Sequence, residues 1–376
     1  MVCRRDAAER TLVSAILSTV IWVIARIPQF AKRDYRNTNL SMLAVWGKMA
    51  AVYHQYLATN DKTQNMISRL ASLVLAGFTF GAAFCLAAAD DSVLLFTSFR
   101  KNGQDGLHLM WSRDGYTWTA LKNDASFLEP KVGGKLMRDP NIIQGPDGTF
   151  HMVWTTGWTS NGLGYASSKD LLDWSPQQLV EVMTHEPKTR NVWAPELFYL
   201  AARQEFLIFW SSTIPGRFPE TATNGDKGYN HRIYATTTKD FKTYSPTTLF
   251  YNDGFNVIDA TIVQDGSRFV MLLKDETLNP PQKNLRLAVS DKPEGPYGKA
   301  APAFTGKYWA EGPTVIKIGD TWFVYFDRYR EHRYGVATTK DFKTWNDESD
   351  KVSFPKDHRH GTVFRVSRAV FEKLPQ

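Results

Sequence analysis

The chain has 376 residues, of which 43% are hydrophobic and 13% aromatic, and its formal net charge is +7. The aromatic content excludes a disordered chain, and the low cysteine count excludes a disulfide scaffold. Residues 1–89 hold 10 Lys+Arg and 4 Asp+Glu, which leaves 35 and 34 for residues 90–376. The long segment is therefore almost neutral, and no nucleic-acid partner is expected for it.

Residues 1–65 form a leader of unexplained role. The apolar run Thr11–Arg26 is short for a membrane span, which needs about 20 residues. Arg26-Ile27-Pro28-Gln29-Phe30 and the basic stretch Lys32 to Arg36 follow it, and together they resemble the start of one PQ-loop membrane repeat. We interpret residues 1–65 as an over-extended gene model or a fusion, with a membrane protein as the alternative.

Residues 66–89 show the layout of a secretory signal peptide. Arg69 precedes an apolar stretch from Leu70 to Leu86, and Ala87-Ala88-Ala89 supplies the small residues of a cleavage site before Asp90. The pattern predicts a secreted protein, extracellular or periplasmic, with no membrane attachment after cleavage. A membrane anchor formed by the same apolar stretch is the alternative.

From Asp90 onward a turn motif recurs five times, at spacings of about 50 to 70 residues. Each copy follows a short strand-like run, and an earlier aromatic and β-branched strand precedes that run. Such a repeat of short strands predicts an all-β protein, a five-bladed β-propeller, with a β-sandwich as the alternative. The five copies are Ser112-Arg113-Asp114, Ser168-Lys169-Asp170, Thr238-Lys239-Asp240, Ser290-Asp291-Lys292 and Thr339-Lys340-Asp341.

The first unit lacks the leading strand that the other four have. A matching strand occurs at the C-terminus, where Gly361–Val366 is similar to Gly312–Ile318. We therefore expect the C-terminal strand to complete the first blade and close the ring, which removes exposed sheet edges. Residues 90–376 are then one propeller domain, which is expected to be a monomer.

Each leading strand begins with an ionisable residue. Because leading strands line the axis of a propeller, these side chains are expected to converge at one end of the channel. Clustered carboxylates shift their pKa values apart, as acid–base catalysis requires. The five starts are Arg138-Asp139-Pro140, Ala194-Pro195-Glu196, Ile258-Asp259-Ala260, Ala310-Glu311-Gly312 and Arg359-His360-Gly361.

The loops on the same face carry aromatic and basic residues that suit a sugar. Trp158 leaves its strand into a loop of Gly, Ser and Asn, and Trp193 and Trp309 lie just before two leading strands. Arg328 lies in a further loop of this face. Aromatic rings can cover the C–H faces of sugars, so we predict that these four residues bind substrate.

These motifs, in their order along the chain, resemble glycoside hydrolase family 43, a group of five-bladed propellers. The resemblance implies that Asp139 is the general base, that Glu311 is the general acid, and that Asp259 orients the acid and raises its pKa. Arg138 and Glu196 are predicted to bind substrate, although Glu196 stands where many members of the family carry Asp. His360 matches a histidine on the axis that helps to hold calcium in some members, although no Asp-rich calcium loop is visible.

The resemblance implies hydrolysis of O-glycosidic bonds with inversion, with no required cofactor and with calcium possible near His360. The two catalytic carboxyls should stand roughly 6.5–9.5 Å apart to admit the attacking water. The implied substrates are oligo- or polysaccharides that carry arabinofuranosyl, xylosyl or galactose-type sugars, removed from chain ends. The alternatives are a non-catalytic carbohydrate-binding propeller and a retaining fructan or sucrose hydrolase.

Overall fold

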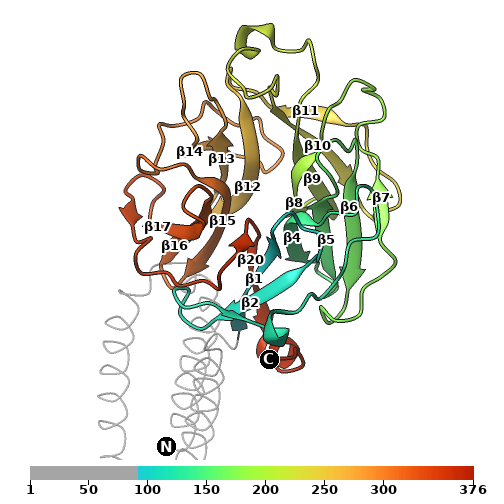
Figure 1. The fold of residues 1–376 in the computed structure, drawn as a ribbon, viewed down its shortest axis with the longest axis vertical. Coiled ribbons are helices and arrows are strands. Elements are labelled where there is room, and N and C mark those ends of the chain that lie inside the picture. Colours follow the sequence, from blue (N-terminus) through green and yellow to red (C-terminus); the bar gives the residue numbers. More distant parts are fainter. Residues whose placement is uncertain (1–91) are drawn as a thin grey trace, which may run out of the picture. The chain divides into compact units, whose positions relative to one another are not determined.

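The computed structural model describes residues 92–376, and these residues form five antiparallel sheets around one axis (Figure 1). The predicted all-β propeller is therefore confirmed. The predictions made for residues 1–89, including the signal peptide and the membrane anchor, lie outside the described residues. Among residues 92–376, none of the helices is long and apolar enough for a membrane crossing.

Each sheet is one blade, and its strands follow one another outward from the axis. Blade 4 has three strands, and the other blades have four or five. Blade 1 contains β19 (His358–Arg359), β20 (Val363–Ser367), β1 (Ser92–Arg100), β2 (His108–Ser112) and β3 (Thr119–Ala120). Blade 2 contains β4 (Arg138–Gln144), β5 (Phe150–Thr155), β6 (Leu163–Ser168) and β7 (Gln178–Val180); blade 3 contains β8 (Trp193–Leu200), β9 (Glu205–Ser212), β10 (Arg232–Thr238) and β11 (Thr248–Tyr251). Blade 4 contains β12 (Val257–Asp265), β13 (Arg268–Asp275) and β14 (Asn284–Ser290); blade 5 contains β15 (Glu311–Ile318), β16 (Thr321–Arg328), β17 (Arg333–Thr339) and β18 (Asn346–Asp347).

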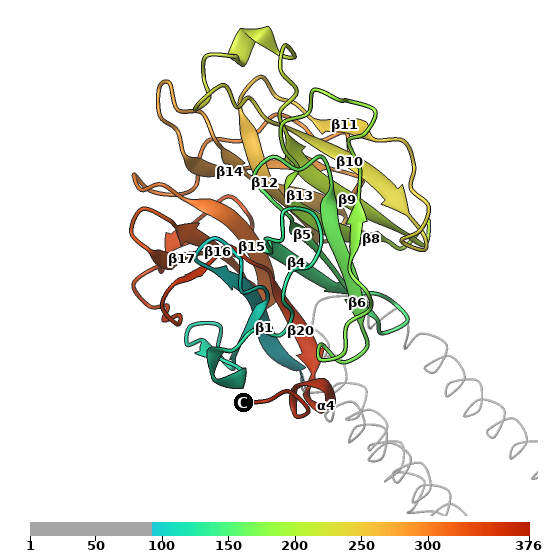
Figure 2. The same cartoon turned by 45° about the vertical axis from the view of Figure 1, so that its right-hand side comes forward.

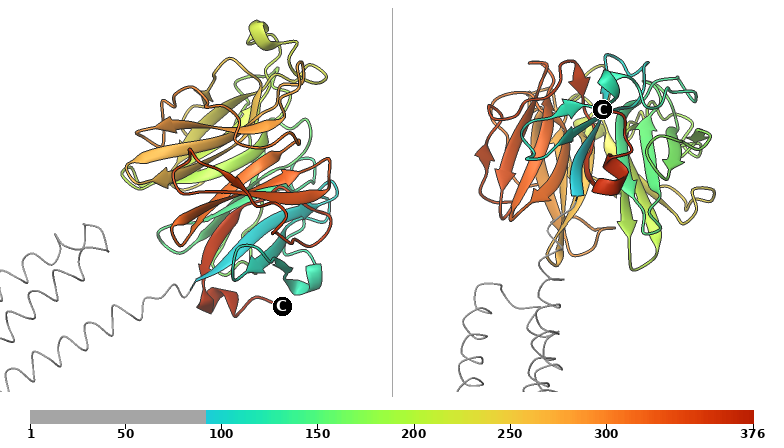
Figure 3. Two further views of the ribbon diagram at one scale, coloured as in Figure 1. Left: turned by 90° about the vertical axis from the view of Figure 1, so that its left-hand side faces the viewer. Right: turned by 90° about the horizontal axis from the view of Figure 1, so that it is seen from below.

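The two ends of the described chain meet in blade 1, as the repeat predicted. β20 pairs antiparallel with β1 from Ser92↔Ser367 to Phe96↔Val363, and Figure 2 shows the two strands side by side. The short helix α4 (Arg368–Phe371) follows β20 at the foot of this blade (Figure 3). Both strands thus gain a paired edge, which locks the ring.

The recurring turn motif joins the third strand of a blade to its outer strand. In blade 2, Ser168 Oγ accepts from the N–H groups of Asp170 and Leu171 at 3.2 and 2.9 Å. Asp170 Oδ1 then accepts from two further N–H groups, each at 2.9 Å. These side chains satisfy turn amides that no strand partner reaches.

At least one hydrogen bond near the axis crosses each of the five blade junctions. The donors and acceptors lie near the same end of the axis, so the ring of contacts fixes the blades relative to one another. The five bonds are Asn141 Nδ2 to Thr362 Oγ1 (2.9 Å), Leu197 N to Asn141 Oδ1 (3.0 Å), Asp259 N to Ser211 Oγ (3.2 Å), Gly312 N to Asp259 Oδ2 (3.0 Å) and Val363 N to Thr314 Oγ1 (3.0 Å).

The hydrophobic core lies between neighbouring blades rather than on the axis. One cluster, for example, joins blades 2 and 3 through Val153, Ile208 and Trp210, each almost fully buried. Burying one large apolar side chain contributes about 1.5–3 kcal/mol. Stability thus comes from the blade faces, which leaves the axis available for polar side chains.

Candidate active site

A one-residue β-bulge at the start of each innermost strand directs the polar side chains. In blades 2 to 5 the pairing shifts at this point by one residue, and in blade 1 it shifts between β19 and β20. Bulges turn a side chain out of its regular alternation and are common beside active sites. Four bulge residues adopt a positive φ, namely Asp139 (53°), Ala194 (45°), Asp259 (52°) and Gly312 (57°).

The bulges refine the predicted alignment of the five ionisable residues. Asp139 and Asp259 share one position, whereas Glu311 stands one residue earlier, as the last paired residue before its bulge. Glu196 is the first paired residue after the bulge of β8. The side chains therefore reach the axis from three different levels of their strands.

Asp139 is held as a carboxylate by two donors. Thr155 Oγ1 donates to its Oδ2 at 2.7 Å, and His360 Nδ1 lies 3.3 Å from its Oδ1. Burial alone would raise the pKa of Asp139, but the His360 charge and these hydrogen bonds lower it to about 2. Asp139 is therefore ionised at neutral pH and can accept a proton.

Asp259 and His360 meet at the same end of the axis. Asp259 Oδ2 accepts from Gly312 N at 3.0 Å, and burial is the main cause that raises the Asp259 pKa to about 6. A Cβ on Gly312 would lie 2.4 Å from the His360 ring. Only glycine fits this approach and this positive φ without strain, so Gly312 allows His360 to reach Asp139.

Glu311 lies between two cations. Lys274 Nζ, at the end of β13, contacts its Oε2 at 2.9 Å, and an Arg359 guanidinium nitrogen contacts its Oε1 at 3.4 Å. Arg359 also contacts Asp327 at 2.5 Å, and Lys274 contacts Glu276 at 2.6 Å. The Glu311 carboxyl is thereby fixed in position within a chain of alternating charges.

Two of these residues are absent from the predicted site, Lys274 and Arg359. Lys274 is almost fully buried, which for a lysine requires paired acids. Its signal in the sequence is a charge at the end of an apolar strand, Phe269–Lys274. Arg359 stands beside His360 in a motif that we used for the histidine alone.

Glu196 belongs to the same cluster but differs in protonation. Burial raises the pKa of Glu196 to about 8, with the Asp259 charge acting in the same direction. At neutral pH it is therefore mainly a neutral carboxylic acid. As an O–H donor, it can hydrogen-bond a hydroxyl or ring oxygen of a ligand.

The aromatic residues predicted to bind substrate lie on the rim. Trp158 is 49% exposed, and its ring meets Trp193 edge-on at 5.7 Å between centroids. The Arg138 guanidinium lies 4.3 Å from the centre of the Trp158 ring. These three predicted residues therefore form one surface next to Asp139.

Trp309 lies just before blade 5, and Arg328 is the last residue of β16 in that blade. Arg330 stacks on Trp309, 3.7 Å from its centre. Arg328 instead lies over Tyr308 at 3.9 Å and pairs with Glu331 at 2.7 Å. Arg328 is thus engaged in its own loop, while Arg359 contacts Glu311.

The surroundings of His360 do not fit a calcium site. Among residues 92–376, no group of three or more His, Cys, Asp or Glu side chains is arranged to hold a metal ion. His360 Nδ1 faces Asp139 directly, so this nitrogen is engaged by a carboxylate. We derive no catalytic step through calcium.

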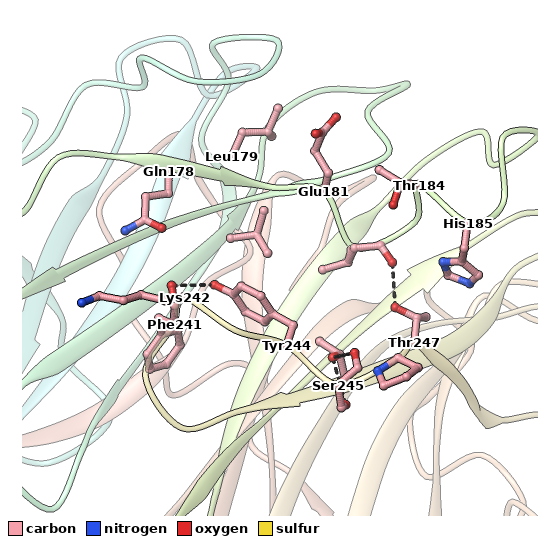
Figure 4. Close-up of a pocket in the computed structure, with 14 residues that line it drawn as sticks. Gln178, Leu179, Glu181, Thr184, His185, Phe241, Lys242, Tyr244, Ser245 and Thr247 are labelled. Atoms are coloured by element: carbon pink, nitrogen blue, oxygen red, sulfur yellow. Dashed lines mark hydrogen bonds between the residues drawn. The ribbon is translucent and has the colours of Figure 1, made fainter.

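A separate cavity of about 540 Å³ lies between the outer strands of blades 2 and 3 (Figure 4). Glu181 is the only carboxylate among its 14 lining residues, which include none of the predicted site residues. Glycoside hydrolysis needs two carboxyls. The axial cluster, and not this cavity, has the required groups.

The charge of His360 predicts a pH-dependent stability. Burial lowers its pKa, but Asp139 and the other carboxylates raise it to about 9, against about 6.5 in the unfolded chain. This stabilisation is complete below pH 6.5 and is lost as the pH rises through 9.

We expect the unfolding free energy of the wild type to fall by about 3 kcal/mol more than that of His360→Gln between about pH 6 and about pH 10. Urea titrations at the two pH values measure this difference. His332→Gln, on an exposed position of the rim, should keep the wild-type slope. Parallel slopes for wild type and His360→Gln would contradict the assigned ion pair.

Residues 92–372 match a family model described as "Probable glycosyl hydrolase domain". The comparison with curated proteins gave no match. The chain is similar to the solved α-L-arabinofuranosidase of Lactobacillus brevis at 16% identity, over 56% of this chain and 72% of that chain, with a TM-score of 0.45. A thermostable family-43 glycoside hydrolase is 18% identical over 59% of this chain and 74% of that chain, with a TM-score of 0.44. The catalytic domain of a family-62 α-L-arabinofuranosidase of Coprinopsis cinerea is 14% identical over 59% of this chain and 71% of that chain, with a TM-score of 0.44. The PQ-loop resemblance of the leader finds no support in these comparisons.

Proposed function

We propose that hydrolysis by this chain inverts the configuration at the anomeric carbon. The chain belongs to the probable glycosyl hydrolase family that residues 92–372 match, and it is therefore a glycosidase acting on a saccharide. Asp139 acts as the general base toward water, and Glu311 acts as the general acid toward the leaving oxygen. Asp259, His360 and Glu196 orient these two groups and the sugar between them.

The observation that carries the proposal is the pair of contacts made by two consecutive residues. His360 lies 3.3 Å from Asp139, and the preceding residue, Arg359, lies 3.4 Å from Glu311. One short segment thus holds the base and the acid at the same end of the axis. A sugar above this segment would have one carboxyl on each side, which is the arrangement that both steps of the reaction require.

The protonation state of Asp139 and the contacts of Glu311 support different roles for these two carboxyls. The low pKa of Asp139, about 2, matches a base that is ionised in the resting enzyme. Glu311 contacts two cations, Lys274 and Arg359, which hold its carboxyl in place. After one turnover Asp139 is protonated and Glu311 is ionised, and proton exchange with water returns both groups to their starting states.

We propose exo action on arabinofuranosyl, xylosyl or galactofuranosyl side branches or chain ends. The support is the long segment between β9 and β10, residues 213–231, which carries Tyr229 against Trp193. Such a wall beside the axis favours a pocket over an open cleft. We propose a secreted enzyme, which agrees with the leader pattern.

The test is hydrolysis of a panel of nitrophenyl glycosides, followed by proton NMR. We expect release from one of the α-L-arabinofuranoside, β-D-xyloside or β-D-galactofuranoside, with loss of activity in Asp139→Asn. Absence of hydrolysis across these three glycosides and their oligosaccharides would refute the proposed specificity.

A further inference from the structure

A continuous row of aromatic rings leads away from Asp139 across the rim of blades 2 and 3. Trp158 meets Trp193 at 5.7 Å, and Trp193 meets Tyr229 at 4.8 Å. The Trp193 indole N–H donates to the Trp158 carbonyl at 3.1 Å, which fixes the two residues relative to each other. We call Trp158, Trp193 and Tyr229 the aromatic strip.

An arginine covers a ring at each end of the aromatic strip. Arg138 lies 4.3 Å from the centre of Trp158, and Arg190 lies 3.9 Å from the centre of Tyr229. Arg138 donates to the Asn102 side chain at 3.1 Å, and Arg190 donates to the carbonyl of Lys227 at 3.0 Å. Both of these acceptors are neutral.

Neither arginine forms an ion pair with a carboxylate among residues 92–376, although most site cations do. Lys274, Lys283 and Arg359, for example, all contact acids. Glu276, whose charge acts on His231 next to Trp193 and Tyr229, already contacts two lysines. The two guanidiniums therefore keep charge and donors for a ligand.

The strip lies on the face that carries the catalytic carboxyls. Trp193 is the last paired residue before the bulge of β8, the position that Arg138 holds in β4 and Glu311 holds in β15. Arg190 lies three residues before Trp193, at the same end of the blade. A saccharide with one sugar at Asp139 would therefore extend over the rings toward Arg190.

We propose that the aromatic strip binds an acidic sugar, a uronic acid residue of the saccharide whose glycosidic bond is cleaved. The inference rests on the proposed function and adds the substrate class. The exposed Trp158 and the neighbouring Trp193 present apolar surface to the sugar chain, and the Arg190 guanidinium, which itself covers Tyr229, donates to the carboxylate. A planar guanidinium matches a carboxylate in geometry, and an aromatic ring below it keeps that plane oriented.

The test compares binding of matched oligosaccharides by calorimetry in an Asp139→Asn background, so that no probe is cleaved. The probes are a xylo-oligosaccharide with one glucuronic acid branch, an oligogalacturonide, the carboxyl-reduced form of each, and a sulfated oligosaccharide of equal size. We expect at least one uronate probe to bind roughly tenfold more tightly than its reduced form at low salt. Arg190→Met should remove this preference.

Arg203→Met is the matched control, because Arg203 lies in the hairpin between β8 and β9 and pairs with Glu205 at 2.7 Å. It removes the same charge and should leave the preference intact. Equal binding of acidic and reduced probes, no binding of either acid, an unchanged preference in Arg190→Met, or tighter binding of the sulfate would each overturn the inference. Hydrolysis by the wild type without any acid preference would overturn it while leaving the proposed function standing, and preference without hydrolysis would do the reverse.

Discussion

Replacement of Asp139 by asparagine is expected to lower kcat roughly 10³-fold on any glycoside that the enzyme cleaves. The amide cannot take a proton from water, and this is the role that the ionised carboxylate has in the proposed reaction. Asparagine suits the position in other respects. It has nearly the same shape, and it tolerates the left-handed backbone found at Asp139, where φ is 53°.

The variant leaves His360 without its anionic partner, so some loss of stability is expected with the fold retained. Circular dichroism and a thermal melt establish the folded fraction at the assay temperature. The matched control is Asp265→Asn, in the turn between β12 and β13, where Asp265 pairs with Arg268 at 2.8 Å. Near-wild-type kcat in a folded Asp139→Asn protein would refute the assignment of the base.

Replacement of Glu311 by glutamine is expected to lower activity in a way that depends on the leaving group. A natural oligosaccharide leaves as a poorly stabilised alkoxide and needs the proton, so its kcat/KM should fall roughly 10³-fold. A dinitrophenyl glycoside leaves as a stable anion, and its loss should be roughly tenfold. The ratio of the two losses is the measured quantity.

Glu205→Gln is the control for this substitution. Glu205 lies at the end of β9 that is remote from the axial carboxylates, and it pairs with Arg203. Its two kcat/KM values should remain at the wild-type level. A purely structural effect at Glu311 would lower both substrates equally, since a distorted site does not distinguish leaving groups. Equal losses would therefore contradict the role of Glu311 as the general acid.

The propeller could be predicted from the sequence because its determinants are local and repeated. The Ser168–Asp170 turn, for example, is made entirely from residues adjacent in sequence. Closure by β20 was also predictable, since Gly361–Val366 repeats an earlier strand. In blade 4 the motif reads Ser290-Asp291-Lys292, with the acid displaced, and here the outer strand is absent from the sheet.

The site was predictable in its residue types but not in its contacts. A bulge adds one residue to a strand, so the start of a strand in the sequence fixes the level of its side chain only approximately, and Asp139, Glu196 and Glu311 stand at three levels. Lys274 in blade 4 reaches Glu311 in blade 5, and these two residues are 37 positions apart in the sequence. Such pairing depends on how the sheets pack, and no local pattern encodes it.

The measurement that tests the central claim most directly is proton NMR of the first product formed from the glycoside that the panel identifies. Two carboxyls that act on water and on the leaving oxygen in a single displacement must invert the anomeric carbon. We predict that the initial sugar has the opposite anomeric configuration to the substrate and then mutarotates. Initial release of the same anomer would contradict the roles assigned to Asp139 and Glu311.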